Sequence, residues 1–534
     1  MFRFKASLLG CMAAFLAVSG TGCSGSEPLE PAAPAHSGGN EHLDVSVAFW
    51  DIGRAFENND EVLQKIESDF NITIQPVQVN YADYEEKFKI WAASGQFPDL
   101  FAHSLVSDSP GIYADWIKQR LIRPLPDDLT PYPNVYRVAQ IPDTLALRRN
   151  KKLYMLPRIA YPTNDLWMLE RVVFVRKDWM EKLGFADPKN FDEFSDMMKA
   201  FTRDDPDGNA LDDTVGLTAA SLDYLSWVFS PTFPQFAASK WVQEDDGWIP
   251  YYASPKMNAV AAQFRQLYSD GGLDPNFYLV KEVDALEKFA QGKAGALAYK
   301  ATPQSLSKLA RLWDKYHPGI DFYDSVKILH LWPAEDGNRY YYVASTYWTE
   351  SYFSAKVDDR KMDRILKLYD YLLSPEGKML MKYGIEGKDY VNRDGEIVIT
   401  RPREESGEFV SLQKLYPSTE IFRNLASWGL EQSYRLDPIN KDNYGEKNIR
   451  TSLEEMRWLL NHARATPFMY SIISLSTDNK DKLSAAIHPM DDLTKAVLGT
   501  GDPVKLWQEN LKTYNRMGLQ KAIREVNDKL AASE

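Results

Sequence analysis

The stretch Asp44-Val45-Ser46-Val47-Ala48-Phe49 places apolar side chains at alternate positions, which predicts a β-strand. Residues 62–70 follow with apolar side chains at helical spacing, and Ile72-Thr73-Ile74 then alternates again. A strand, a helix and a strand at this spacing form a βαβ unit, whose two strands lie parallel in one sheet. The start of the folded part therefore predicts an α/β protein.

Further elements extend this pattern along the chain. Short apolar runs at 97–102 and 172–175 predict buried strands. Amphipathic helices are predicted over 81–94, from Asn190 onward, and over 256–270, 360–373 and 503–531. A chain of 534 residues is too long for one ordinary core, so two or more domains are expected.

The composition narrows the class of protein. Hydrophobic residues make up 44% and charged residues 26%, which is typical of globular proteins. The formal net charge of −13 disfavours nucleic acid as a partner, because phosphate backbones need a basic surface. Aromatic residues reach 13%; most are expected in the core, and some can line a site for the flat apolar faces of sugar rings.

The first residues resemble a bacterial lipoprotein signal over 1–22, with Cys23 as the lipidated residue. Arg3 and Lys5 precede an apolar stretch at 8–18, which is too short to span a bilayer. Gly20 stands where lipoprotein signals prefer leucine, so an ordinary secreted protein cleaved nearby stays an alternative. Residues 23–43 are rich in Pro, Ser, Gly and Ala and predict a flexible spacer. Both cysteines of the chain lie by position 23, which excludes an internal disulfide and a thiolate zinc site in the mature chain.

Known catalytic motifs are missing from the sequence. It has no GxxxxGK[ST], HExxH or GxSxG pattern, and its seven histidines are scattered. A carboxylate pair for glycoside hydrolysis stays open, because such a pair is defined by distance in space.

One acidic segment resembles the first half of an EF-hand calcium loop. In Asp205-Pro206-Asp207-Gly208-Asn209-Ala210-Leu211-Asp212-Asp213, oxygen-bearing side chains alternate around a glycine. The predicted ligands are the side chains of Asp205, Asp207, Asn209 and Asp213 and the carbonyl of Leu211. Gly216 stands where a full EF-hand loop has its bidentate glutamate, and the alternative is a solvated acidic turn. We expect a structural calcium ion.

A series of segments resembles the solute-binding proteins of carbohydrate importers of the ATP-binding-cassette (ABC) type, and within them the large lipoproteins that include the alginate-oligosaccharide-binding proteins. The resemblance covers about 45 to 530. The segments that carry it are Ala93-Ser94-Gly95-Gln96-Phe97-Pro98-Asp99-Leu100, Lys152-Leu153-Tyr154-Met155-Leu156-Pro157, Phe174-Val175-Arg176-Lys177-Asp178-Trp179, Gly272-Leu273-Asp274-Pro275, Ser374-Pro375-Glu376-Gly377 and Tyr383-Gly384-Ile385-Glu386-Gly387.

The resemblance implies a two-lobed periplasmic-binding-protein-like fold of type II. Each lobe is a mixed sheet flanked by helices, and the ligand cleft lies between the lobes. We assign residues 44–165 plus about 300–360 to the N-terminal lobe, and about 166–300 plus about 361–534, with a helical extension, to the C-terminal lobe. The resemblance further implies no catalysis, an oligosaccharide ligand, delivery to ABC permease subunits, a location at the cell envelope outside the cytoplasm, and a monomer. Thr214 stands where some relatives place a carboxylate near the metal.

Sugar-binding candidates lie at the ends of predicted strands and in the loops beside them, where α/β clefts open. They are Trp50, His103, Arg158, Trp167, Trp332, Trp348 and Trp428. Trp179 is assigned to the core. Two other functions stay open: presentation of a ligand to a membrane sensor, and a secreted polysaccharide-degrading enzyme.

Overall fold

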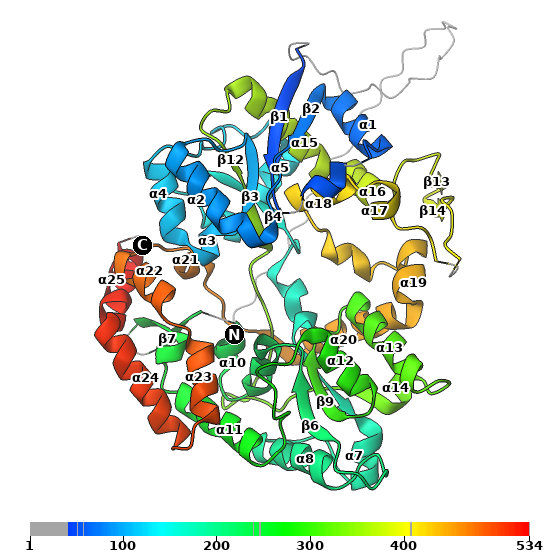
Figure 1. The fold of residues 1–534 in the computed structure, drawn as a ribbon, viewed down its shortest axis with the longest axis vertical. Helices are drawn as coiled ribbons and strands as arrows, with labels where there is room; N and C mark the ends of the chain where they lie inside the picture. Colours follow the sequence, from blue (N-terminus) through cyan, green and yellow to red (C-terminus); the bar gives the residue numbers. More distant parts are fainter. Residues whose placement is uncertain are drawn as a thin grey trace, which may run out of the picture. The chain divides into compact units, whose positions relative to one another are not determined.

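The computed structural model describes residues 41–532, apart from 51, 57, 239, 245–246 and 406–407 (Figure 1). The predicted signal segment, Cys23 and nearly all of the predicted spacer lie outside the described residues. Strand β1 (Leu43–Ala48) begins at the last residue of that spacer. Among the described residues, no helix is long and apolar enough to cross a membrane.

The first sheet confirms the predicted βαβ unit. Its strand order is β2 (Ile72–Pro76), β1, β3 (Leu100–His103), β12 (Tyr347–Phe353) and β4 (Met155–Ile159). Strand β1 lies parallel to β2 and β3, whereas β12 lies antiparallel to β3 and β4. Helix α1 (Glu61–Phe70) connects β1 to β2, and the Asp60 carboxylate caps it by accepting from the amides of Val62 and Leu63.

A second mixed sheet has the order β10 (Val326–Leu329), β5 (Val172–Arg176), β9 (Ala294–Tyr299) and β6 (Val215–Ala219). Helices cover both faces of this sheet, because the side chains of β5 point alternately to its two sides. Val173 and Val175 point into a core shared with α8 (Phe191–Arg203) and α11 (Met257–Ser269). Phe174 points to the other side, into a core shared with α12 (Glu282–Ala290) and α13 (Pro303–Tyr316). The two sheets and their helices form the two lobes that the sequence predicts.

Two elements, one strand and one helix, lie in a different lobe from the one expected from the sequence. Strand β10 lies within 300–360 but pairs with β5 of the second sheet. Helix α15 (Asp359–Leu373) places Met362, Ile365 and Leu366 in the core of the first sheet. It also docks α5 (Pro133–Ala139), because the Asp370 carboxylate accepts from the first amides of that helix.

Several chain segments connect the two lobes, and three of them run side by side. Residues 160–171 link β4 to β5, and residues 330–346 link β10 to β12. Residues 426–430 leave the core of the first sheet after Leu425. The amides of Ala160 and Tyr161 both donate to the Thr346 carbonyl, at 2.9 and 3.1 Å. The Trp428 amide donates to the Ile159 carbonyl at 2.9 Å. These hydrogen bonds tie the segments together beside the candidate site.

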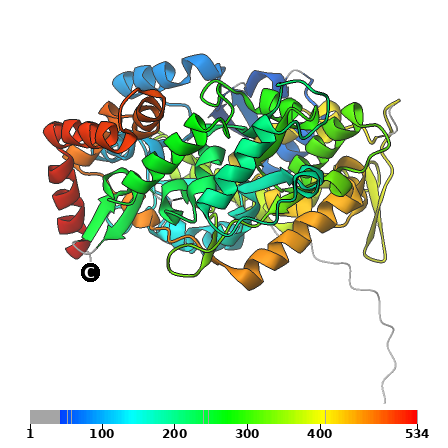
Figure 2. The same ribbon diagram turned by 90° about the horizontal axis from the view of Figure 1, so that it is seen from below.

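The predicted helix over 503–531 is two helices, α24 (Pro503–Met517) and α25 (Leu519–Ala531). They separate at Gly518, whose φ of +112° suits glycine but few other residues. Trp507 of α24 is buried in the core of the second lobe. Figure 2 shows α25 beside the hairpin of β7 (Trp241–Glu244) and β8 (Gly247–Pro250), where the Asn527 side chain pairs with the Trp248 backbone.

Candidate functional site

Three tryptophans from distant parts of the chain gather at one end of the strands of the first sheet. Trp50 follows β1, Trp348 belongs to β12, and Trp428 follows α18 (Thr419–Leu425). The ring centroids of Trp348 and Trp428 are 4.8 Å apart, and those of Trp50 and Trp348 are 6.2 Å apart. Trp348 keeps 51% of its surface exposed. We call these three residues the tryptophan cluster.

Arg158 of β4 lies beneath the tryptophan cluster and is only 1% exposed. Its guanidinium carbon is 5.2, 5.3 and 4.3 Å from the ring centroids of Trp50, Trp348 and Trp428. Its Nη1 donates to Asn424 Oδ1 at 2.7 Å. Burial lowers the Arg158 pKa to about 10. The π faces of the rings partly replace the hydration that this cation loses on burial. In return, the cation holds the three rings in place.

The tryptophan cluster lines a cavity of about 270 Å³. Polar side chains complete the lining: Gln413, Glu420, Arg423 and Asn424. Flat apolar rings bordered by hydrogen-bonding groups match the two kinds of surface on a sugar, its ring faces and its hydroxyl edges. We call it the tryptophan cavity.

A larger cavity of about 580 Å³ shares Gln413, Arg423 and Trp428 with the tryptophan cavity. Both lobes contribute to its lining, since Glu170 and Lys300 come from the side of the second sheet. Glu170 accepts from the Tyr161 hydroxyl at 2.9 Å and pairs with Lys300 at 3.3 Å. This larger cavity opens along the segments that connect the lobes.

His103 and Trp167 lie near these cavities without lining them. His103, at the end of β3, is buried against Tyr84 and Phe88 and lies 3.4 Å from the Glu85 carboxylate. Tyr84 in turn packs edge-on to Trp50. Trp167 lies on the connecting segment 160–171, where its Nε1 donates to the Ser345 carbonyl at 2.8 Å.

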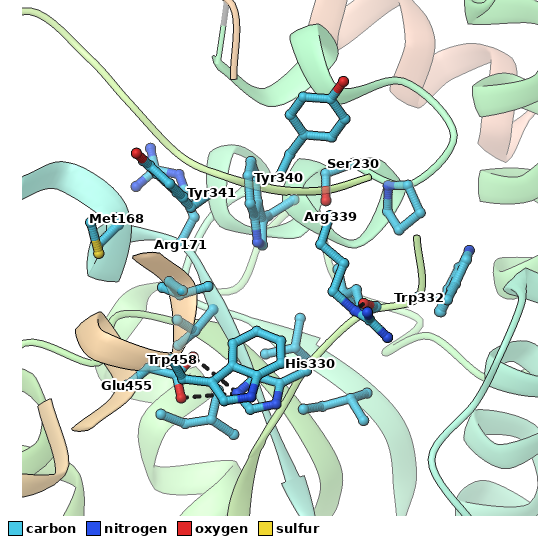
Figure 3. Close-up of a pocket in the computed structure, with 18 of the residues that line it drawn as sticks. Met168, Arg171, Ser230, His330, Trp332, Arg339, Tyr340, Tyr341, Glu455 and Trp458 are labelled. Carbon is cyan, nitrogen blue, oxygen red and sulfur yellow. Dashed lines mark hydrogen bonds and ion pairs between the residues drawn. The ribbon is translucent and has the colours of Figure 1, made fainter. Parts of the chain in front are cut away.

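Trp332 lies apart from the tryptophan cluster. It is 8% exposed and packs against Phe191 and Phe194 in the second lobe. It lines a small cavity of about 40 Å³ (Figure 3), too small for a sugar. There His330 Nε2 lies 3.0 and 3.1 Å from the two Glu455 oxygens. The His330 ring stacks on Trp458, which fixes α20 (Glu446–His462) to the end of β10.

Several residues of the site carry no visible signal in the sequence. Arg423 and Asn424 lie in α18, and Gln413 lies in α17 (Leu412–Leu415), far along the chain from the first strands. The one local hint is the spacing of Asn424 and Trp428, because four residues place Asn424 Oδ1 3.1 Å from Trp428 Nε1. Only the fold brings these residues to Trp50 and Trp348.

The acidic loop after α8 is tightly turned. Asp205, Gly208 and Ala210 have φ values of +46°, +75° and +60°. Asp205 accepts from the amides of Asn209 and Ala210, at 3.0 and 3.1 Å. Asn209 Nδ2 donates to Asp207 at 2.8 Å and to Asp213 at 3.2 Å.

The carboxylates of the acidic loop do not form a ready metal site in this structure. Over the part of the chain that the structure describes, no three His, Cys, Asp or Glu side chains are arranged to hold a metal ion. The predicted calcium ligands of the acidic loop nevertheless all offer oxygen atoms, which is the donor type that calcium prefers. Burial, followed by the Asp205 side chain, raises the pKa of Asp207.

Two lobes joined by connecting segments, with an aromatic cavity beside those segments, agree with the arrangement of a solute-binding protein that the sequence resemblance implies. The chain belongs to the bacterial extracellular solute-binding protein family, whose model matches residues 57–379. This confirms the resemblance found in the sequence. The family is one of solute-binding proteins and not of enzymes.

Two relatives come from Bacillus subtilis. Lipoprotein LipO is 23% identical over 59% of this chain and 61% of its own length. The polygalacturonan/rhamnogalacturonan-binding protein YtcQ is 22% identical over 64% of this chain and 66% of its own length. The chain therefore matches somewhat less than two thirds of each of these relatives.

The fold is also similar to that of a solved structure, the alginate-binding protein AlgQ2 without calcium ion. The match has a TM-score of 0.64 at 17% identity and covers 92% of this chain and 98% of that one. This likeness confirms the predicted two-lobed α/β fold.

Proposed function

We propose that the protein captures an oligosaccharide outside the cytoplasm and delivers it to the permease subunits of an ABC importer. The observation that carries this proposal is the tryptophan cavity, whose ring faces and polar edges suit a sugar. The names of the relatives YtcQ and AlgQ2 agree with a carbohydrate ligand. The protein works as a single chain and does no chemistry on the sugar.

Capture rests on stacking and on closure of the lobes. Sugar rings stack on Trp348 and Trp428, while Gln413 and Asn424 hydrogen-bond to hydroxyl groups. The second lobe closes over the ligand by bending of the connecting segments. From the side of the second sheet, Glu170 and Lys300 line the larger cavity that adjoins the tryptophan cavity. The closed, loaded form is the one that the permease recognises.

Lipidation at Cys23 keeps the protein at the membrane surface. The residue follows an apolar stretch and small residues, and the spacer that follows lets the folded part reach a permease. The relative LipO is itself named a lipoprotein. The sugar is thereby held next to its point of entry.

Calcium binds the acidic loop and has a structural role. Asp205, Asp207, Asn209 and Asp213 would supply side-chain oxygens, and Leu211 a carbonyl. A hard cation would neutralise carboxylates that otherwise rely on the Asn209 amide. The loop is also held to α7 (Lys177–Leu183), because Lys182 donates to the Pro206 carbonyl at 2.8 Å.

A thermal-shift screen against plant, algal and host oligosaccharides, with calcium present, tests the proposal. A ligand that binds only the folded state raises the melting temperature. We expect a clear rise with one sugar class, and mass spectrometry should recover that sugar unchanged. Cleaved sugar would make the protein an enzyme, and no shift with any oligosaccharide would refute carbohydrate capture.

A further inference from the structure

Helix α22 (Asp478–Ala486) gives the two lobes a further contact besides the three connecting segments. It packs with the second lobe, because Leu483 shares a core with Tyr514 of α24 and Leu519 of α25. Helix α24 in turn packs on α11 of the second lobe. The same helix α22 also contacts α4 (Pro110–Lys118) of the first lobe (Figure 1). A change in the angle between the lobes therefore acts on the contact between α22 and α4.

Residues 466–481, which we call the strap, lead into α22 and contact both lobes. Tyr470 packs in the core of the first sheet. Two residues later, Ile472 shares a small core with Trp241 of the β7–β8 hairpin. The residue after that tryptophan, Val242, lies in the core of the second lobe. The strap is therefore packed between the two lobes.

One turn of the strap is held by a cation from each side. Arg149, in the turn before β4 of the first lobe, donates from Nη2 to the Ser474 carbonyl at 2.6 Å. The buried Lys480 of α22 donates to the Ile473 carbonyl at 2.9 Å and to the Leu475 carbonyl. Because α22 packs with the second lobe, the two cations tie this turn to both lobes.

Asp481 brings α22 directly against the first turn of α4. A Cβ atom placed on Gly111 would lie 2.9 Å from Asp481 Oδ2 and 3.7 Å from Asp481 Cβ. Glycine at position 111 therefore permits the close approach. Asp481 Oδ2 accepts from the Ser476 hydroxyl at 2.6 Å, whereas the buried Oδ1 has no hydrogen-bond partner among the described residues. A negative charge is favourable at the first turn of a helix, so the contact is attractive as well as close.

The contact of α22 with α4 lies on the edge of the first lobe that carries the tryptophan cluster. Strand β3 ends at His103, and the short helix α3 (Leu105–Asp108) joins it to α4. The Leu105 amide donates to the Glu350 carboxylate at 3.0 Å, which fixes α3 to β12 close to Trp348. Movement that parts the lobes over the tryptophan cluster therefore also parts α22 from α4.

We propose that the strap favours the closed arrangement of the lobes, so that Arg149, Gly111 and Asp481 set the affinity for sugar without touching the sugar. None of these three residues lines the tryptophan cavity or the larger cavity. A contact that is made only when the lobes are close raises the closed fraction, and with it the apparent affinity. The three are positioning residues. This inference rests on the proposed function, because it concerns how easily the proposed sugar cleft opens.

An engineered disulfide tests the strap. Gly111→Cys combined with Asp481→Cys would place two Cβ atoms 3.7 Å apart, within the range of about 3.5–4.5 Å that disulfides need. Both native cysteines lie by position 23, so no native thiol competes in the described part of the chain. Without sugar, the oxidised variant should have a smaller radius of gyration in X-ray scattering than the reduced one. Wild-type protein with and without reductant is the control.

Sugar kinetics give a second measurement on the same variant. The oligosaccharide with the largest thermal shift should associate with the oxidised form, and dissociate from it, about tenfold more slowly than with the reduced form. Reductant should restore both rates. Thiol titration checks that the disulfide has formed, and its failure to form in the folded protein would show that α22 and α4 do not meet.

Arg149→Gln weakens the strap without adding a bond. We expect a larger radius of gyration without sugar and about fivefold weaker sugar binding, at nearly unchanged melting temperature. Gly111→Leu should act in the same direction, because its side chain would push Asp481 away. Arg148→Gln is the matched control, since this neighbouring side chain is exposed, and it should change neither quantity.

The outcomes separate this inference from the proposed function. Equal radii and equal rates in the oxidised and reduced forms would show that the lobes open without parting the strap, which overturns the proposal. Tighter sugar binding by Arg149→Gln would also overturn it, because the strap would then oppose closure. If no oligosaccharide binds the wild-type protein, the proposed function fails, while the radius of gyration without sugar still tests the strap.

Discussion

Arg158 is the residue on which the tryptophan cluster depends. It is buried beneath three rings and bonded to Asn424, so its removal leaves a cavity and takes a positive charge from beside the buried Glu350. We expect Arg158→Ala to lower the free energy of unfolding by about 3 kcal/mol. Chemical denaturation measures this, with the exposed Arg148→Ala as control. Equal stability of the two variants would show that the buried cation has no structural role.

Substitution of Trp348 tests sugar binding with little effect on folding, because half of this residue is exposed. Trp348→Ala should weaken sugar binding about tenfold through lost stacking, with little change in melting temperature. Trp91 of α2 (Tyr84–Ser94) lines neither cavity and provides the control. Titration calorimetry of both variants measures the effect, and an unchanged affinity for Trp348→Ala would place the sugar elsewhere.

At the scale of elements, Asp60 joins two helices of the first lobe. Its carboxylate caps α1 and also accepts from the Ser418 amide and hydroxyl, at 2.8 and 2.7 Å. Asp60→Ala should therefore cost about 3 kcal/mol, more than an ordinary cap. Asp358→Ala, at the exposed cap of α15, should cost about 1 kcal/mol. Urea unfolding of the two variants compares them, and equal losses would contradict the double role of Asp60.

The acidic loop predicts a calcium effect that depends on pH. Calcium binds carboxylates in their charged form, and the raised pKa of Asp207 lets protons compete at higher pH than at an ordinary aspartate. Calcium should therefore raise the melting temperature at pH 7, and less so as the pH falls toward the Asp207 pKa. Differential scanning calorimetry with calcium or a chelator measures this. Asp205→Asn should abolish the calcium shift, and a shift that survives in this variant would place the ion elsewhere.

For the whole molecule, local patterns predicted much of the fold. Alternation over 44–49 predicted β1, and ordered motifs predicted the two-lobed architecture. The pairing of β10 with β5 was not predictable in this way, because strand partners far apart in sequence leave no periodic signal. The candidate site, like the fold, is predictable from the sequence only in part. Trp50, Trp348 and Trp428 were candidates, whereas Arg423 and Gln413 join them only through folding.

The proposed closure of the lobes leads to a prediction for the whole molecule. Backbone hydrogen bonds hold the connecting segments together, and we expect the lobes to rotate about these segments as rigid bodies when a sugar binds. Sugar binding should reduce the radius of gyration measured by small-angle X-ray scattering. Trp348→Ala should show the same reduction only at higher sugar concentration. An unchanged radius at saturation would show that capture occurs without closure.

Sugar capture at the tryptophan cavity is tested most directly by calorimetric titration of the wild-type protein with the oligosaccharide that gives the largest thermal shift, followed by mass spectrometry of the recovered sugar. The account predicts saturable binding of one sugar per chain, weakened by Trp428→Ala, and a sugar of unchanged mass. Shortened sugar, or binding indifferent to Trp428, would contradict it.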